Sequence, residues 1–191
     1  MDKNDDMNEK CDKSDISENI YINRNEDVPE RLDLHDNSGD SCILASQDVV
    51  DETYKLYIYH LKRRMAEIGL KFPFDIKKLG ASQYSSSLQT LANQFVVSPQ
   101  RGWVHEQAQN VDLHILHFNT FRQLLFGLFQ EGGLIWERVL VIFYFCSDLS
   151  IRALQEKVSE CYLHIHKWTT FYLDTRLSVW VEQQGGWVRC L

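Results

Sequence analysis

The sequence contains few residues that interrupt helices and no long apolar segment. Only three prolines occur in 191 residues, at positions 29, 73 and 99. No stretch alternates strictly between apolar and polar residues, so the signature of half-buried strands is missing. The longest apolar run, residues 139–146, is far short of the roughly 20 residues that cross a membrane as a helix. These absences predict an all-α protein.

Cysteine usage and the N-terminus indicate a reduced compartment. The five cysteines form no Cys-x-x-Cys pair, and the acidic N-terminus has no apolar signal segment. Zinc ligands usually show tight, repeated spacing. That spacing is missing from the two candidate groups, which are Cys161, His164 and His166, and His114 and His117. Nucleophile elbows, phosphate-binding glycine loops and paired-carboxylate motifs are also missing. We expect an intracellular protein with no catalytic residues, metal or cofactor. An α-helical enzyme using Cys161, His164 or His166 is a remote alternative.

The negative charge is concentrated in the first 40 residues. They hold 13 Asp or Glu against 5 Lys or Arg, a charge of −8, which leaves the rest of the chain, out of a total of −7, at about +1. A near-neutral folded part lacks the basic patch that phosphates require, so no nucleic-acid partner is expected. The acidic segment has too few large apolar residues to offset its ordering entropy by burial. We predict a disordered acidic tail over residues 1–44 and a helical domain over residues 45–191.

Helical periodicity recurs throughout the predicted domain. Residues 139–146 are apolar on every side, as expected for a helix surrounded by other helices. A single helix over residues 140–180 would be about 60 Å long, so a break is expected near residues 157–160. The first helix is expected to begin at Ser46 or Asp48, which can cap it. The other helices are bounded by proline, serine and glycine, and the predicted set covers residues 46–68, 73–79, 88–96 and 111–129.

Two tryptophan-centred segments carry the most specific information in the chain. Residues 128–139 contain a Gly-Gly pair followed by Trp136-Glu137-Arg138, and residues 180–187 read Trp-Val-Glu-Gln-Gln-Gly-Gly-Trp. Taken alone, each is also explained by a helix end with glycine and a packed tryptophan. Their order, their spacing and the apolar helix between them resemble the first and second homology motifs of the Bcl-2 family. In that family the motifs read Asn-Trp-Gly-Arg and Trp-Ile-x-x-x-Gly-Gly-Trp.

The resemblance extends over roughly residues 45–191 and is greatest to the Bax/Bak pore-forming branch. Further stretches similar to that branch are residues 54–59, 143–149, 152–158 and 168–173. The resemblance implies a Bcl-2-like helical bundle with residues 139–146 as its central apolar helix. It also implies a surface groove that accepts an amphipathic death-ligand (Bcl-2 homology 3) helix.

The resemblance also assigns roles to individual residues. Arg138 corresponds to the arginine that pairs with an aspartate of the ligand, a charge-assisted contact that fixes register. The residues expected at the groove are Phe121, Leu125, Phe129, Trp136, Glu137, Arg138 and Val139. For the apolar members, ordinary core packing is the open alternative. The second motif contributes Trp180, Gly185, Gly186 and Trp187 as packing and turn residues.

The chain departs from the family pattern around the groove. Ile135 and Glu137 replace the Asn and Gly on either side of the tryptophan, which removes a hydrogen bond and adds a charge that opposes the ligand's Asp. The third motif reads Leu-x-x-x-Gly-Asp in the family, inside an amphipathic helix. Its predicted match here has Ala81 in place of the Asp, and comprises Phe72, Ile76, Leu79, Gly80 and Ala81. A short connecting helix with no ligand role is the alternative for this segment.

The function implied by the resemblance is regulation of apoptosis at the mitochondrial outer membrane. We expect a Bax/Bak-like pro-apoptotic effector, located in the cytoplasm and at that membrane, which oligomerises with itself or with Bcl-2 relatives and permeabilises the membrane. The alternative is a pro-survival guardian that sequesters death-ligand helices. Members of the family commonly carry an apolar anchor after the second motif. An apolar stretch of about 20 residues after Leu191 in the native transcript would establish an anchored protein.

Overall fold

The computed structural model describes residues 44–74, 79–128, 134–189 and 191. All regular secondary structure in these ranges is helical, which confirms the predicted all-α class. Residues 1–43, and with them almost all of the predicted acidic tail, lie outside the described residues. The elements, in chain order, are α1 Gln47–Glu67, α2 Ser85–Val96, α3 Pro99–Gln109, α4 Phe118–Gly127, α5 Trp136–Gln155, α6 Ser159–Tyr172, the π-helical turn η1 Leu173–Leu177, α7 Ser178–Gln183 and the 3₁₀ turn η2 Trp187–Arg189.

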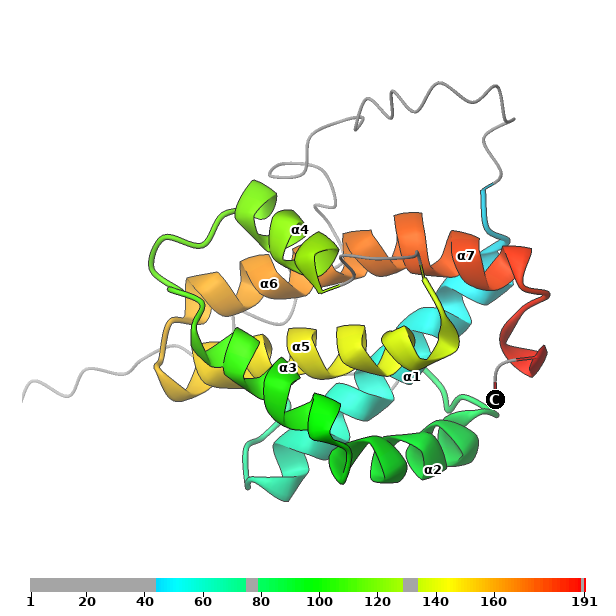
Figure 1. The fold of residues 1–191 in the computed structure, drawn as a ribbon, viewed down its shortest axis with the longest axis horizontal. Helices are drawn as coiled ribbons and strands as arrows, with labels where there is room; N and C mark the ends of the chain where they lie inside the picture. The colour runs from blue at the N-terminus through cyan, green and yellow to red at the C-terminus, as the bar shows by residue number, and fades with distance from the viewer. Residues whose placement is uncertain (1–43, 75–78, 129–133, 190) are drawn as a thin grey trace, which may run out of the picture. The chain divides into compact units, whose positions relative to one another are not determined.

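Helix α5 is the central element of the bundle. Residues 139–151 are all buried, on every face of the helix. In Figure 1, α5 lies in the middle of the helices, and α1, α3 and α6 pack along it. A helix that is apolar all round is stable only when other helices cover it. The predicted central position of residues 139–146 is therefore confirmed. No helix in the described ranges is long and apolar enough to cross a membrane.

The boundaries of α1 agree with the sequence prediction. The helix begins directly after Ser46 and is followed by Gly69, whose φ of +73° suits a residue without a side chain. Ser46 does not cap α1 with its side chain. Its backbone N–H and its hydroxyl both donate to a carboxylate oxygen of Glu182, at 3.0 and 2.6 Å. The start of α1 is thereby tied to α7.

The predicted break near residues 157–160 is present between α5 and α6. Lys157 has a φ of +59°, in the left-handed region. The Val158 N–H donates to the Ala153 carbonyl at 2.9 Å, which satisfies a carbonyl left open at the end of α5. The chain ends α5 with lysine where glycine is the common choice, so composition alone gave only an approximate position for the turn.

Two helix predictions were wrong at their N-terminal ends. The helix predicted over residues 111–129 begins at Phe118, because polar side chains organise the preceding residues into turns. Asp112 accepts a hydrogen bond from the His114 N–H at 2.9 Å, and the His117 ring accepts one from the Thr120 N–H at 3.3 Å. Helix α2 begins at Ser85, three positions before its predicted start at residue 88.

Helix α3 was not predicted. Bounding serine and proline residues were expected only to end the helix over residues 88–96, but Pro99 is also the first residue of α3. Proline is favoured at that position because its fixed φ suits a helix and its missing N–H would have no intrahelical acceptor. The short helix predicted over residues 73–79 lies partly outside the described residues, at 75–78. Pro73 and Phe74 before the gap are not helical.

Candidate ligand-binding groove

The two tryptophan segments meet in space and pack together. The Trp136 ring, at the start of α5, lies 4.3 Å from the Trp180 ring of α7 and 6.3 Å from the Trp187 ring, centroid to centroid. Trp187 is buried, and its indole N–H donates to the Thr53 hydroxyl of α1 at 3.0 Å. This tryptophan cluster of Trp136, Trp180 and Trp187 joins the first turn of α5 to the C-terminal helices and to α1.

Two glycines place Trp187 in the cluster. Gly185 and Gly186 have φ values of +91° and +83°, in the left-handed region where a side chain is strained. The Gly186 N–H donates to the Val181 carbonyl at 2.9 Å and closes the end of α7. A Cβ on Gly185 would lie 2.9 Å from Cδ of Arg189. The positive φ values at both positions therefore favour glycine here, and the reversal of the chain brings Trp187 back over the core.

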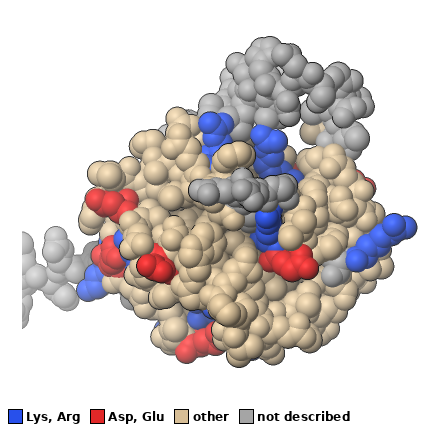
Figure 2. Space-filling model, in the orientation of Figure 1, with Lys and Arg blue, Asp and Glu red and all other residues tan. Residues whose placement is uncertain are grey.

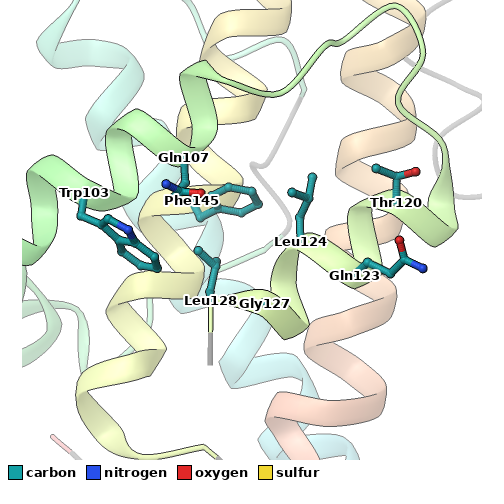
Figure 3. Close-up of a pocket in the computed structure, with 8 residues that line it drawn as sticks. All are labelled: Trp103, Gln107, Thr120, Gln123, Leu124, Gly127, Leu128 and Phe145. Atoms are coloured by element: carbon teal, nitrogen blue, oxygen red, sulfur yellow. The ribbon is translucent and has the colours of Figure 1, made fainter. Parts of the chain in front are cut away.

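A cleft lies on the surface between α3 and α4. It encloses about 570 Å³ and is lined by Trp103, Gln107, Thr120, Gln123, Leu124, Gly127, Leu128 and Phe145. Figure 3 shows Trp103 and Gln107 on α3, facing Leu124 and Leu128 at α4, with Phe145 of α5 between the two helices. A second hollow of about 440 Å³ shares Gln107, Thr120 and Leu124 with the first. We refer to the two hollows together as the groove: α3 and α4 are the walls of the larger hollow and α5 is its floor, whereas residues that join α3 to α4 line much of the smaller one.

The groove presents a mixture of apolar and uncharged polar side chains, with little formal charge. None of the described residues that line the larger hollow is Lys, Arg, Asp or Glu, and the smaller one is lined by Asp112 and by the imidazole of His117. Trp103 is 41 % exposed beside the groove. Figure 2 shows that the neighbouring surface over α2 also lacks Lys, Arg, Asp and Glu. Such a lining favours an amphipathic ligand whose apolar face enters the groove.

The α4 residues predicted to line the groove face the core instead. Phe121 and Leu125 are buried, and the Phe121 ring lies 5.7 Å from the Trp168 ring of α6. Successive residues are turned by about 100° around a helix, so the neighbouring set at positions 120, 124 and 128 faces the groove. The hydrophobic stripe of α4 thus includes both a core side and a groove side, and the sequence pattern does not distinguish them.

The remaining predicted groove residues lie at or near the start of α5. Val139 is buried and is not part of the lining; Phe145, two helical turns further along, forms the floor in its place. Trp136 belongs to the tryptophan cluster. Glu137 is exposed and Arg138 is partly buried, both in the first turn of α5. Phe129 lies outside the described residues.

The predicted third motif does not form a helix where it is described. Phe72 packs against Phe74 at a centroid distance of 5.6 Å, Leu79 is partly buried, and Gly80 and Ala81 are exposed in irregular backbone. Ile76 lies outside the described residues. Helix α2 offers the same spacing in a helical setting, as Leu88-x-x-x-Ala92-Asn93. The sequence pattern did not predict a third motif in α2, because Ala92 and Asn93 replace the Gly and Asp of the family pattern.

Helix α2 lies against the core with its apolar side. Leu88, Ala92 and Phe95 are buried, whereas Leu91 is 36 % exposed. The Tyr144 hydroxyl of α5 donates to the Ala92 carbonyl at 3.3 Å, and the Tyr144 and Phe95 rings lie 5.0 Å apart. The motif-bearing face of α2 is therefore occupied by contacts within the bundle.

The described residues form an all-α bundle built around a buried apolar helix, with a cleft on its surface between α3 and α4. The chain belongs to the Bcl-2 family: residues 80–187 match the family described as "Apoptosis regulator proteins, Bcl-2 family". The matched range begins at Gly80, so it includes α2 and excludes Phe72 and Ile76.

Individual relatives agree with the family assignment. The apoptosis regulator BAX of Mus musculus is 42% identical over 68 residues, which cover 36% of this chain and 35% of the relative. Bcl-2-like protein 1 of Gallus gallus is 27% identical over 112 residues, covering 57% of this chain and 47% of the relative. The chain spans about a third to a half of the length of these curated relatives. The likeness to BAX is consistent with the predicted Bax-like branch.

A solved structure shows the same fold. The protein titled "Trichuris suis BCL-2" superimposes with a TM-score of 0.62, covering 74% of this chain and 88% of that protein. The sequence identity is 14%, so the likeness concerns the fold. The Bcl-2-like helical bundle predicted from the tryptophan motifs is confirmed.

Proposed function

We propose that this chain regulates apoptosis by binding an amphipathic death-ligand helix in the groove between α3 and α4. The groove itself carries this proposal. Its walls present Trp103, Leu124 and Leu128, the lining of its larger hollow carries no formal charge, and its two hollows share three lining residues. Recognition of a helix in a groove uses apolar anchors at successive turns of the ligand, which such a surface fits.

Membership of the Bcl-2 family and the likeness to BAX support an effector role at the mitochondrial outer membrane. In this proposal the protein moves between cytoplasm and membrane, and ligand binding releases α5 and α6 to perturb the bilayer and to form oligomers with copies of itself or with Bcl-2 relatives. A guardian role is the second candidate, and it is favoured by the sequence and the burial of α2, the helix that carries the third-motif spacing. Its Asn93 lacks the charge of the motif's Asp, and its Leu88, Ala92 and Phe95 are buried in the bundle.

The structure gives little support for the enzyme alternative. Cys161 is buried, and burial raises the pKa of its thiol, which disfavours the nucleophilic thiolate. His166 is also buried, and burial lowers its pKa to about 4, so it is a poor general base near neutral pH.

The groove is tested by a charge placed on its wall. Leu124→Glu is expected to weaken binding of a fluorescent death-ligand peptide at least about tenfold, because the carboxylate must stay hydrated where an apolar anchor should dock. Fluorescence anisotropy measures the affinity. Phe126→Glu is the matched control, since Phe126 lies on the same helix, is 79% exposed and does not line the groove. Equal weakening by both variants, or by neither, contradicts the groove assignment.

Whether the protein acts as an effector or as a guardian is tested with the same peptide and dye-loaded vesicles of phosphatidylcholine and cardiolipin. Peptide-triggered dye release by the wild type, and not by Leu124→Glu, is the result expected for an effector. If the protein binds peptide and blocks release by an added effector, it is a guardian.

Glu137 is expected to lower affinity for acidic ligands. It is exposed beside Arg138, where the resemblance places the ligand's Asp, and like charges oppose docking. We expect Glu137→Gln to raise peptide affinity by about twofold to fivefold, within the range of a screened surface charge. A peptide with Asn in place of the Asp should show no gain.

The matched control for Glu137→Gln is Glu160→Gln. Glu160 is a first-turn glutamate of α6, as Glu137 is of α5, so both variants lose the same interaction with a helix N-terminus. An unchanged affinity for Glu137→Gln, or an equal gain for Glu160→Gln, would show that the charge at position 137 has no role in ligand choice.

A further inference from the structure

Helix α3 forms one wall of the groove but buries little apolar surface. Of its eleven residues, Val104 and Ala108 are buried, and both are small. The opposite wall, α4, buries Phe121 and Leu125, and α2 buries Leu88, Ala92 and Phe95. Stabilisation by burial scales with the apolar area removed from water. The fully buried apolar side chains of α3 are therefore smaller than those of α2 and α4, although α3 packs closely along α5.

Near its N-terminal end, α3 is attached to a buried carboxylate of α5. Arg101 Nη1 lies 2.8 Å from Asp148 Oδ2, and its Nη2 donates to Oδ1 at 3.1 Å. The Asp148 side chain is 3% exposed. Arg64 of α1 also donates to Asp148, and both guanidinium groups lie 4.8 Å from the centroid of the Tyr144 ring. His105 Nδ1 lies 3.4 Å from Oδ2.

At its C-terminal end, α3 is attached to a second charged residue of α5. Arg152 Nη1 donates to the carbonyls of Ala108 and Gln109, at 2.7 and 2.9 Å. Its Nη2 donates to the Val111 carbonyl at 2.5 Å. A guanidinium supplies the donors that the last carbonyls of a helix lack and complements the negative end of the helix dipole. Glu156 holds the same guanidinium from its other side, at 2.7 Å from Nε.

The two attachments come from one face of α5. Asp148 and Arg152 are four residues apart, so their side chains lie one above the other along the helix. They reach opposite ends of α3, and the groove-lining residues Trp103 and Gln107 lie between those ends (Figure 3). Rotation or withdrawal of α3 would break at least one attachment and would change the width of the groove.

We propose that Asp148 and Arg152 are positioning residues for the groove: they fix α3 as a wall, by charge rather than by apolar burial. The role of α3 as a wall of a ligand-binding groove rests on the proposed function. The attachment of α3 to α5 by charged residues does not depend on it. Arg64 provides the internal comparison. It binds the same Asp148 carboxylate from α1 and makes no described contact with α3, so losing it should loosen α1 without moving the groove wall.

The test uses Arg101→Met and Arg152→Met, with Arg64→Met as the matched control. Methionine keeps most of the apolar stem and removes the guanidinium. Amide hydrogen exchange of α3 and affinity for the death-ligand peptide are measured on the full chain. Loss of a charged hydrogen bond changes an equilibrium by about a factor of ten or more. We expect about tenfold faster exchange in α3 and about tenfold weaker binding for the two test variants, with both quantities within about twofold of wild type for Arg64→Met.

Specific outcomes overturn the inference. It fails if α3 exchange is unchanged in folded Arg101→Met and Arg152→Met, or if Arg64→Met loosens α3 equally. Should Arg101→Met not fold, Arg101→Lys keeps the charge and loses the two-pronged geometry, and α3 exchange should then lie between wild type and the loosened state. If the wild type binds no death-ligand peptide, the proposed function fails, while the exchange measurement still decides whether the two arginines hold α3.

Discussion

Trp187→Ala is expected to lower the free energy of unfolding by about 3–5 kcal/mol, the range for removing a buried tryptophan. Trp187 is 3% exposed, contacts Trp136, and donates to the Thr53 hydroxyl at 3.0 Å. Its loss would leave a cavity where α1, α5 and α7 meet, and a buried hydroxyl without its donor. Urea denaturation followed by circular dichroism measures the change.

Two further variants give this prediction its controls. Trp103→Ala removes a tryptophan that is 41% exposed at the groove, and we expect a loss of about 1 kcal/mol or less. Trp187→Phe keeps a large ring and removes the indole N–H, so its cost should be nearer the value of one hydrogen bond, about 1 kcal/mol. Equal losses for Trp187→Ala and Trp103→Ala would show that the tryptophan cluster does not hold the C-terminal helices to the core.

The features that the sequence predicted well have local physical causes. Residues 139–146 are apolar on all sides and could only be central in the fold, and Ser46 and Gly69 mark both ends of α1. The left-handed glycines Gly185 and Gly186 and the nearby tryptophan make one compact turn whose conformation is set by the residues themselves. Such features depend little on distant partners, which is why the family motif could be recognised without a structure.

The groove depends on how helices are turned relative to one another, and the sequence does not encode this locally. Phe121 and Leu124 look equivalent in an amphipathic pattern, yet one contacts Trp168 and the other lines the groove. Helix α3 was missed because its two small buried residues give almost no periodic signal. Its attachment to Asp148 and Arg152 joins residues more than forty positions apart, which no local pattern reveals.

The stability of the bundle is expected to fall as the pH is lowered from about 6.5 to 4, because of His166. The imidazole lies between α1 and α6, with its ring 4.7 Å from Phe74 and its Nε2 3.5 Å from the Tyr54 hydroxyl. Burial lowers its pKa to about 4, against 6.5 in the unfolded chain. In this window the unfolded state binds a proton that the folded state does not bind.

Between these two pKa values the contribution of His166 to the free energy of unfolding is lost progressively, by about 3 kcal/mol in all. Burial also lowers the pKa of His60, helped by the nearby Arg64 and Arg101, so His60 acts in the same direction. His166→Phe keeps an aromatic ring and removes the titrating group. We therefore expect its unfolding free energy to change by about 3 kcal/mol less than that of the wild type between pH 7 and pH 4.

The comparison variant is Ile165→Val, at a buried neighbouring position of α6. It should lower the free energy of unfolding by about 1 kcal/mol at every pH and leave the slope as in the wild type, because it removes one methylene and no titrating group. Denaturant melts of the three proteins at intervals between pH 4 and 7 separate the two effects. A His166→Phe curve parallel to that of the wild type would mean that His166 is protonated within the folded bundle, and the burial argument would then be wrong.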